Sequence, residues 1–317
     1  LDLKKGALET DIKSLKKAAR QTIGPELEKR IQIIIDTGLI ELKNDFKIYW
    51  NNFPIAKLAT GNDYLNPNFD LIIDDIIEPI QKQKLFDYIG KWIKNKINLV
   101  LKSLIDLKNL KDKNSSIKAL AYQLYEENGV LKRERVSQYI KSLGQNERKI
   151  LRDLGVKFGR YHVFLYQLIK PEAVSLRTLL WKNFHQKYYN IQPPTFGLNF
   201  LDDKDHKNKN FMLLCGFEKF DSMFVRIDIL ERLFMLIINS SDSKENNEIK
   251  IIPEMLNLLG CNKNNFKKLL QKMNYKVYDK ADDTFFKYHP IKKFKKTSTK
   301  KISDENPFKV LKNLNLR

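Results

Sequence analysis

Residues with catalytic potential are few in this sequence, and none stands at a spacing that suits a reaction. The two cysteines, Cys215 and Cys261, cannot form a disulfide framework and have no paired thiols to hold zinc. Two acidic pairs lack the further ligands that a cation needs: Asp74-Asp75 and Asp202-Asp203. The histidines lie far apart: His162, His185, His206 and His289. We therefore expect no metal, no cofactor and no catalysis by this chain alone.

Positive charge is the more informative chemical feature. Lys and Arg number 58 against 38 Asp and Glu, which gives a formal net charge of +20 over 317 residues. Such a field favours polyanions such as DNA, RNA or an anionic membrane surface. Many of the lysines accompany Ile and Asn, a pattern typical of base bias in a genome, so their position matters more than their number. No phosphate-binding loop is present, because the only Gly-Lys pair, Gly90-Lys91, lacks the upstream glycine.

One group of lysines falls on a predicted amphipathic helix near residues 263–273. Its apolar side chains recur at helical spacing: Phe266, Leu269, Leu270 and Met273. Its lysines fall largely outside that stripe: Lys263, Lys267, Lys268 and Lys272. The helix contains no Arg for bidentate guanine contacts, so the pattern favours binding to phosphates over base readout. The alternative is that these lysines only face solvent.

A second group of lysines lies in the C-terminal tail. Residues 287–317 hold nine Lys and one Arg against Asp304 and Glu305, a net charge of +8. The candidates for phosphate contact are Lys292, Lys293, Lys295 and Lys296. We expect residues 290–317 to be disordered and to follow a phosphate backbone, although a tail that merely aids solubility would have the same composition. The apolar motif at 306–311 suggests a docking peptide or a short helix.

A third candidate is the glycine-containing segment 155–164. Two glycines in a β-prone run suggest a bend or a close backbone approach. One interpretation is a nest of backbone N–H groups in which Lys157 and Arg160 face a phosphate. The other is a strand packed beneath the helix predicted over 171–188, with glycines that allow close contact.

The elements around the lysine helix occur in the order typical of a winged helix. We expect a helix over 228–238, a strand over 249–252, helices over 253–259 and 263–273, and a hairpin of 275–278 with 284–288. Asn264 or Asn265 would cap the lysine helix. In a helix–turn–helix pair, this second helix enters a groove of the nucleic acid.

The rest of the chain is predicted to be helical, with a small β hairpin at 46–58. Asn51-Asn52 suits its turn. Asp63–Asn68 is predicted as a loop, followed by helices at about 69–77 and 80–107. The predicted fold class is mainly α with short β hairpins: a helical module over 1–112, a second over 113–192, a winged-helix-like module over 193–289 and the basic tail.

Some stretches resemble the C-terminal region of helicase-related proteins of alphaproteobacteria, DExH-type superfamily-two motors distantly related to the mitochondrial RNA-degradosome helicase. The main block is 151–165 (LRDLGVKFGRYHVFL), continued by 168–171 (LIKP) and 179–181 (LLW). Shorter matches are 53–58, Asn66-Pro67, Gly216-Phe217, 225–233, 253–261 and 306–311. The resemblance covers roughly residues 30–317. It implies a helicase accessory region whose ATPase motor, with its ATP and Mg²⁺, lies N-terminal in cis.

We therefore expect a nucleic-acid-binding accessory region of an ATP-dependent helicase, acting on RNA or DNA and without a membrane partner. The first residue is Leu, so we expect a piece of a longer protein, and the cysteine content favours the reducing cytoplasm. The alternative is a scaffold that docks a nuclease or ribosomal partner through Phe308 and Leu311. A transcription regulator ranks third, since no dimerisation heptad is visible.

Overall fold

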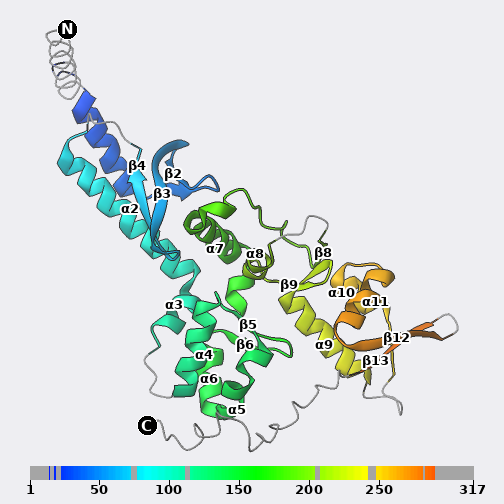
Figure 1. The fold of residues 1–317 in the computed structure, drawn as a ribbon. Coiled ribbons are helices and arrows are strands. Elements are labelled where there is room, and N and C mark those ends of the chain that lie inside the picture. Colours follow the sequence, from blue (N-terminus) through cyan, green and yellow to red (C-terminus); the bar gives the residue numbers. More distant parts are fainter. Residues whose placement is uncertain are drawn as a thin grey trace, which may run out of the picture. The chain divides into compact units, whose positions relative to one another are not determined.

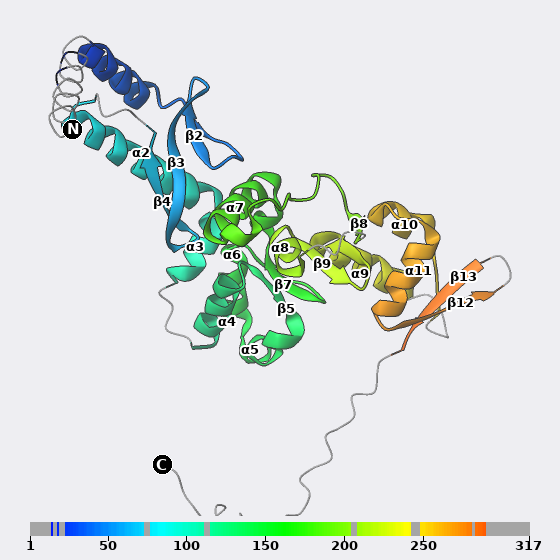
Figure 2. The same cartoon turned by 45° about the horizontal axis from the view of Figure 1, so that its top comes forward.

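The structure is a computed structural model that describes most of the chain (Figures 1 and 2). The described residues are 14, 18, 23–72, 77–110, 115–203, 208–241, 248–280 and 283–289. The chain divides into two compact units. The larger unit comprises Leu1–Leu236 and Asn257–Gly260, and the C-terminal unit comprises Ile237–Leu256 and Cys261–Arg317.

The N-terminal half of the larger unit combines one antiparallel sheet with long helices. Residues 23–37 are helical. The elements that follow are β1 (Ile40–Leu42), β2 (Lys47–Trp50), β3 (Phe53–Asp63), β4 (Asn66–Leu71), α2 (Pro79–Val100), α3 (Lys102–Lys108) and α4 (Ser115–Glu126). The four strands pair in the order β1-β2-β3-β4. Asn51 and Asn52 join β2 to β3 with φ of 43° and 68°, so the predicted hairpin turn is confirmed.

The second half of the larger unit holds two three-stranded sheets, ordered β5-β7-β6 and β8-β10-β9. The first part consists of β5 (Val130–Lys132), η1 (Arg133–Val136), α5 (Ser137–Ser142), α6 (Gln145–Asp153), β6 (Val156–Phe158), β7 (His162–Leu165) and η2 (Tyr166–Ile169). The second part consists of α7 (Pro171–Phe184), η3 (Gln186–Tyr188), β8 (Phe200–Asp202), α8 (Lys209–Leu214), β9 (Phe217–Phe220) and β10 (Met223–Arg226).

Helix α9 (Ile227–Ser241) begins in the larger unit and ends in the C-terminal unit. The later elements are β11 (Ile249–Lys250), α10 (Pro253–Leu259), α11 (Lys263–Lys272), β12 (Tyr275–Lys280) and β13 (Asp283–Tyr288). The strands of the C-terminal unit pair in the order β11-β13-β12.

The predicted fold class is wrong, because the chain is mixed α/β. Among the described residues, helix accounts for 54% and strand for 24%, and the strands form four small antiparallel sheets rather than isolated hairpins. Several strands have only two to four residues, too few to show a period of two in the sequence. The winged-helix module is not identified either, since a few helices beside a three-stranded sheet are not specific to one fold.

Two further predictions fail within the larger unit. The start of the helix predicted at 69–77 belongs to β4, and residues 73–76 lie outside the described residues. Strand β4 pairs antiparallel with β3, which shortens the loop predicted at Asp63–Asn68 to a turn at Tyr64-Leu65. Phe69 of β4 stacks on Phe86 of α2, with ring centroids 4.5 Å apart, so tertiary contact overrides the local helical pattern. The helix predicted over 80–107 is interrupted at Leu101, which separates α2 from α3.

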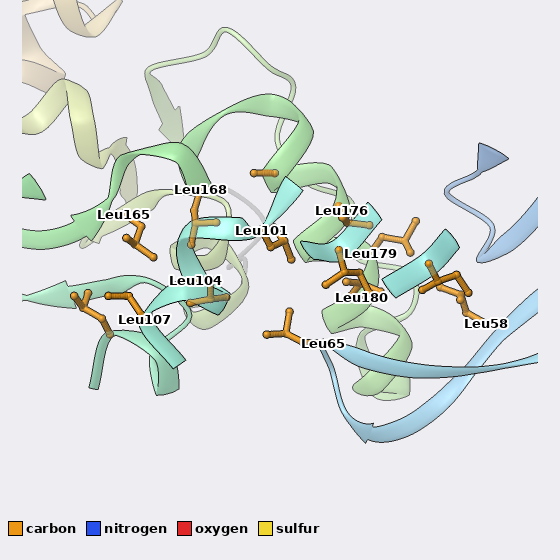
Figure 3. Packing of buried hydrophobic residues seen from close by; sticks show 14 of the residues in the cluster. Leu58, Leu65, Leu101, Leu104, Leu107, Leu165, Leu168, Leu176, Leu179 and Leu180 are labelled. Atoms are coloured by element: carbon orange, nitrogen blue, oxygen red, sulfur yellow. The ribbon is translucent and has the colours of Figure 1, made fainter. Parts of the chain in front are cut away.

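One hydrophobic core runs through the larger unit from Ile31 to Leu180. The buried side of α2 carries residues four apart: Leu85, Ile89, Ile93 and Ile97. Figure 3 shows leucines of α3, β7, η2 and α7 gathered around Leu101, which is fully buried where α2 ends. Burial of Leu101 therefore keeps the junction between α2 and α3 within the core.

Arg177 of α7 is fully buried and binds three backbone carbonyl oxygens. Its Nη1 donates to Asn128 at 2.6 Å, and its Nη2 donates to Leu168 at 3.1 Å and to Leu214. These acceptors belong to the turn after α4, to η2 and to the last residue of α8. Burial lowers the pKa of the guanidinium to about 10, so it remains charged at neutral pH.

We expect Arg177→Met to lower the free energy of unfolding by about 3 kcal/mol or more, because three buried carbonyls would lose their donor. Urea unfolding followed by the fluorescence of the three tryptophans (Trp50, Trp92 and Trp181) measures this loss. Arg232→Met, at an exposed position of α9, is the matched control. Equal midpoints for the two variants would contradict the role of Arg177.

Candidate nucleic-acid interface

The lysine helix predicted from the sequence is α11 of the C-terminal unit (Figure 1). Phe266, Leu269 and Leu270 are fully buried on one side of it, as predicted. The cap, however, is Asn262, whose Oδ1 accepts a hydrogen bond from the N–H of Asn265 at 2.8 Å. The backbone of Asn262 is extended, as a capping residue requires, and the predicted caps Asn264 and Asn265 lie inside the helix.

The opposite side of α11 is polar and contains no acidic residue. Each residue turns the helix by about 100°, so the side farthest from the buried stripe can be read from the spacing. Its exposed residues are Asn264, Lys268, Gln271 and Lys272, and Lys263 is exposed in the first turn, beside the buried stripe. The amides of Asn264 and Gln271 thus stand at the centre of this side. We call these four residues, together with Lys263, the α11 surface. Both kinds of side chain donate hydrogen bonds to phosphate oxygens.

Lys267 does not belong to the α11 surface, because it forms an ion pair within the unit. Its Nζ lies 2.8 and 3.0 Å from the two carboxylate oxygens of Asp279 on β12, and its side chain is only 26% exposed. The hydrogen bond from Lys267 is the main cause that holds the pKa of Asp279 below its usual value. Lys267 therefore anchors α11 to the sheet instead of facing a ligand.

Other lysines of this unit are also paired with carboxylates. Lys250 binds Asp283, and Lys280 binds Glu248. By contrast, in the part of the unit that the structure describes, neither Lys263 nor Lys268 forms an ion pair. Carboxylates therefore neutralise Lys250 and Lys280 of the sheet, whereas Lys263 and Lys268 of α11 present positive charge to solvent.

Sequence reasoning missed the outer face of the hairpin β12–β13. Lys276 and Lys287 lie directly opposite each other and are both exposed, which places like charges side by side. Tyr278 and Phe285, the cross-strand pair on the same face, stack with ring centroids 6.5 Å apart. The alternation of residues along each strand predicts which side chains share a face. Only the pairing register of the two strands shows which of them lie opposite one another.

The predicted backbone nest at 155–164 exists, but its anion is a side chain of the same protein. The β6–β7 turn directs the N–H groups of Arg160, Tyr161 and His162 at the carboxylate of Glu231, with the last two at 2.9 and 3.0 Å. The Arg160 guanidinium lies 5.5 Å from the ring centroid of Phe234. Lys157 is exposed on β6. Glu231 thus occupies the N–H groups of the turn, and they are not available to a phosphate.

His162 connects that turn to a buried cluster of charges. Its Nε2 lies 3.0 Å from Glu218 and its Nδ1 lies 3.8 Å from Glu231, while Lys132 lies 2.7 Å from the other oxygen of Glu218. Burial alone disfavours the imidazolium, but the two carboxylates outweigh it and raise the pKa of His162. The cluster joins β5, β7, β9 and α9. Because His162 and Glu218 are almost wholly buried, their charged groups do not reach a substrate.

The remaining sequence candidates are quickly placed. Lys292, Lys293, Lys295 and Lys296 lie outside the described residues, so their role stays a prediction. Burial raises the pKa of Cys215 to about 12 and that of Cys261 to about 11, which leaves neither as a thiolate at neutral pH. The described residues contain no group of three side chains that could hold a metal ion, and no described helix is long and apolar enough to cross a membrane.

Comparison with known proteins gives no neighbour, since no family model, no curated protein and no solved structure matches the chain.

We expect the charge cluster to make stability depend on pH. A His pKa raised by folding stabilises the protein below the unfolded value near 6.5, and the contribution is lost as pH rises through the folded pKa. Wild type should therefore lose more stability between pH 6 and pH 9 than His162→Gln does. Urea midpoints at the two pH values test this, with the exposed His289→Gln as control. The same loss in all three proteins would show that His162 does not carry the effect.

Proposed function

We propose that the C-terminal unit binds the phosphate backbone of nucleic acid through the α11 surface. The observation that carries this proposal is the contrast in pairing. Lys267, Lys250 and Lys280 are each bound by a carboxylate, whereas Lys263 and Lys268, both exposed on a helix without acidic residues, form no ion pair among the described residues. Lysines that face solvent without acidic neighbours attract phosphates and release counterions on binding.

The composition of the α11 surface favours backbone contact without sequence readout. It holds lysines, Asn264 and Gln271 but no Arg, the side chain that most often reads guanine. Ammonium and amide groups fit phosphate oxygens in many orientations. The proposal therefore includes strong salt dependence and weak sequence preference.

The resemblance to helicase-related proteins adds a wider proposal, in which this chain is the accessory region of a motor that lies N-terminal in cis. The motor would hydrolyse ATP with Mg²⁺, and this chain would hold the strand that the motor moves. The absence of a phosphate-binding loop from the sequence agrees with that division of labour.

Charge reversal at Lys263 and Lys268 tests the α11 surface. We expect the double variant Lys263→Glu/Lys268→Glu to bind a labelled duplex about tenfold or more weakly at low salt, with a slope of log K against log salt that is smaller by about two. Fluorescence anisotropy over a series of salt concentrations measures both quantities.

The matched control is Lys84→Glu/Lys91→Glu, which reverses two exposed lysines of α2 and gives the same net charge. If the two double variants lose affinity equally, binding follows total charge and the α11 surface is not the site. Unfolding midpoints of both variants check that the fold is kept.

A further inference from the structure

The outer face of the sheet in the C-terminal unit carries more lysines than its described carboxylates can neutralise. Side chains alternate between the two faces of a strand, and residues directly opposite each other share a face, so the register shows which charges lie together. The charged residues of this face are Glu248, Lys250, Lys276, Lys280, Asp283 and Lys287. Among these residues, the two carboxylates cannot serve all four lysines.

Two of the four lysines are neutralised within the sheet. Lys280 binds Glu248, and Lys250 binds Asp283. Lys280 also lies over the stacked aromatic pair at the centre of this face, with Nζ 5.3 and 5.7 Å from the two ring centroids. The half of the hairpin next to the β12–β13 connection is therefore satisfied by its own contacts and offers little to a ligand.

Lys276 and Lys287 are in a different situation. They lie directly opposite each other, both are exposed, and neither forms an ion pair within the part of the unit that the structure describes. Glu248 acts on Lys287 only through space, because Lys280 binds its carboxylate at 2.5 Å. Like charges directly opposite in an antiparallel pair destabilise a sheet. The sheet thus keeps a repulsion at this position, although it neutralises the other lysines of the same face.

An anion between the two ammonium groups would turn this repulsion into attraction. Directly opposite residues have Cβ atoms about 4.5–5.5 Å apart, so two long lysine side chains can converge on one group. Each ammonium carries three N–H donors, and the oxygens of a phosphate accept several charge-assisted hydrogen bonds at once. A phosphate therefore matches both the charge and the donors of the pair.

The lysine pair lies at the end of the hairpin that adjoins α11 (Figures 1 and 2). Helix α11 ends at Lys272, and Asn274, with a φ of 67°, leads into β12. The N–H of His289 donates to the carbonyl oxygen of Asn274 at 2.8 Å and so closes this end of the hairpin. The ion pair between α11 and β12 holds the helix against the same strand. The lysine pair is thus close to the last turn of the α11 surface.

The basic tail follows this end of the sheet in the sequence. Strand β13 ends at Tyr288, and the next lysines are Lys292 and Lys293. A ligand with many phosphates in a row can contact the α11 surface and the lysine pair together, whereas an isolated phosphate occupies one of them at a time. The arrangement therefore favours a polymer of phosphates over a single ion.

We infer that Lys276 and Lys287 hold one phosphate group between them, as a second phosphate contact of the C-terminal unit beside the α11 surface. That this phosphate belongs to a nucleic acid rests on the proposed function. The phosphate contact itself does not, because a free polyphosphate presents the same group.

Two ligands separate these sources: a labelled duplex, measured by fluorescence anisotropy over a series of salt concentrations, and inorganic pyrophosphate, measured by calorimetric titration at low salt. The full chain is compared with Lys276→Gln/Lys287→Gln and with the charge-retaining Lys276→Arg/Lys287→Arg. The matched control is Lys141→Gln/Lys149→Gln, which neutralises two exposed lysines of α5 and α6 and gives the same net charge as the first variant. Circular dichroism checks that each variant keeps its fold.

We expect Lys276→Gln/Lys287→Gln to bind the duplex about fivefold more weakly at low salt, with a salt slope smaller by about one, because one phosphate contact is lost. Pyrophosphate should bind this variant at least about threefold more weakly than wild type. The arginine variant and the control should each stay within about twofold of wild type for both ligands.

The inference is overturned if Lys276→Gln/Lys287→Gln matches the control for both ligands. If Lys263→Glu/Lys268→Glu weakens duplex binding in that case, the proposed function stands without the second contact. The opposite result is a wild type that binds no nucleic acid at low salt but binds pyrophosphate in a way that depends on the lysine pair. That result would refute the proposed function and support the phosphate contact.

Discussion

The larger unit is organised around a buried positive charge that has no carboxylate partner among the described residues. The guanidinium of Arg177 reaches the carbonyl oxygens of Asn128, Leu168 and Leu214, and so binds the ends of three segments to α7. Burying a cation is costly unless several acceptors surround it, and carbonyl oxygens at the ends of helices and turns supply that field. The packing of these three segments against α7 therefore depends on one side chain.

Electrostatics divides the chain's charges into those used for folding and those left for a ligand. In the larger unit, Glu231 fills the N–H nest of the β6–β7 turn and holds His162 between two carboxylates. In the C-terminal unit, Lys267 is bound by Asp279, while Lys263 and Lys268 face solvent. A net charge of +20 could not make this distinction, because it counts paired and unpaired lysines alike. The distinction is what directs our functional proposal to α11.

Local patterns predicted local features, and contacts between distant segments decided the rest. The apolar stripe of α11 and the Asn51-Asn52 turn follow from spacing and backbone preference, so both were predictable. Strand β4 was not, because its pairing with β3 and the stacking of Phe69 on Phe86 outweigh a helical pattern. Glu231 lies about seventy residues from the turn that it fills, so no local signal could reveal its role.

The most direct test of the central claim is a titration of the unmodified chain with labelled single- and double-stranded RNA and DNA at low and at physiological salt. Exposed Lys263 and Lys268 on α11 predict binding whose logarithm falls against the logarithm of salt with a slope of about −2 or steeper. The preferred polymer would then identify the substrate. No binding at low salt, or binding that salt does not weaken, would contradict the account and leave the positive charge as a feature of a solvated surface.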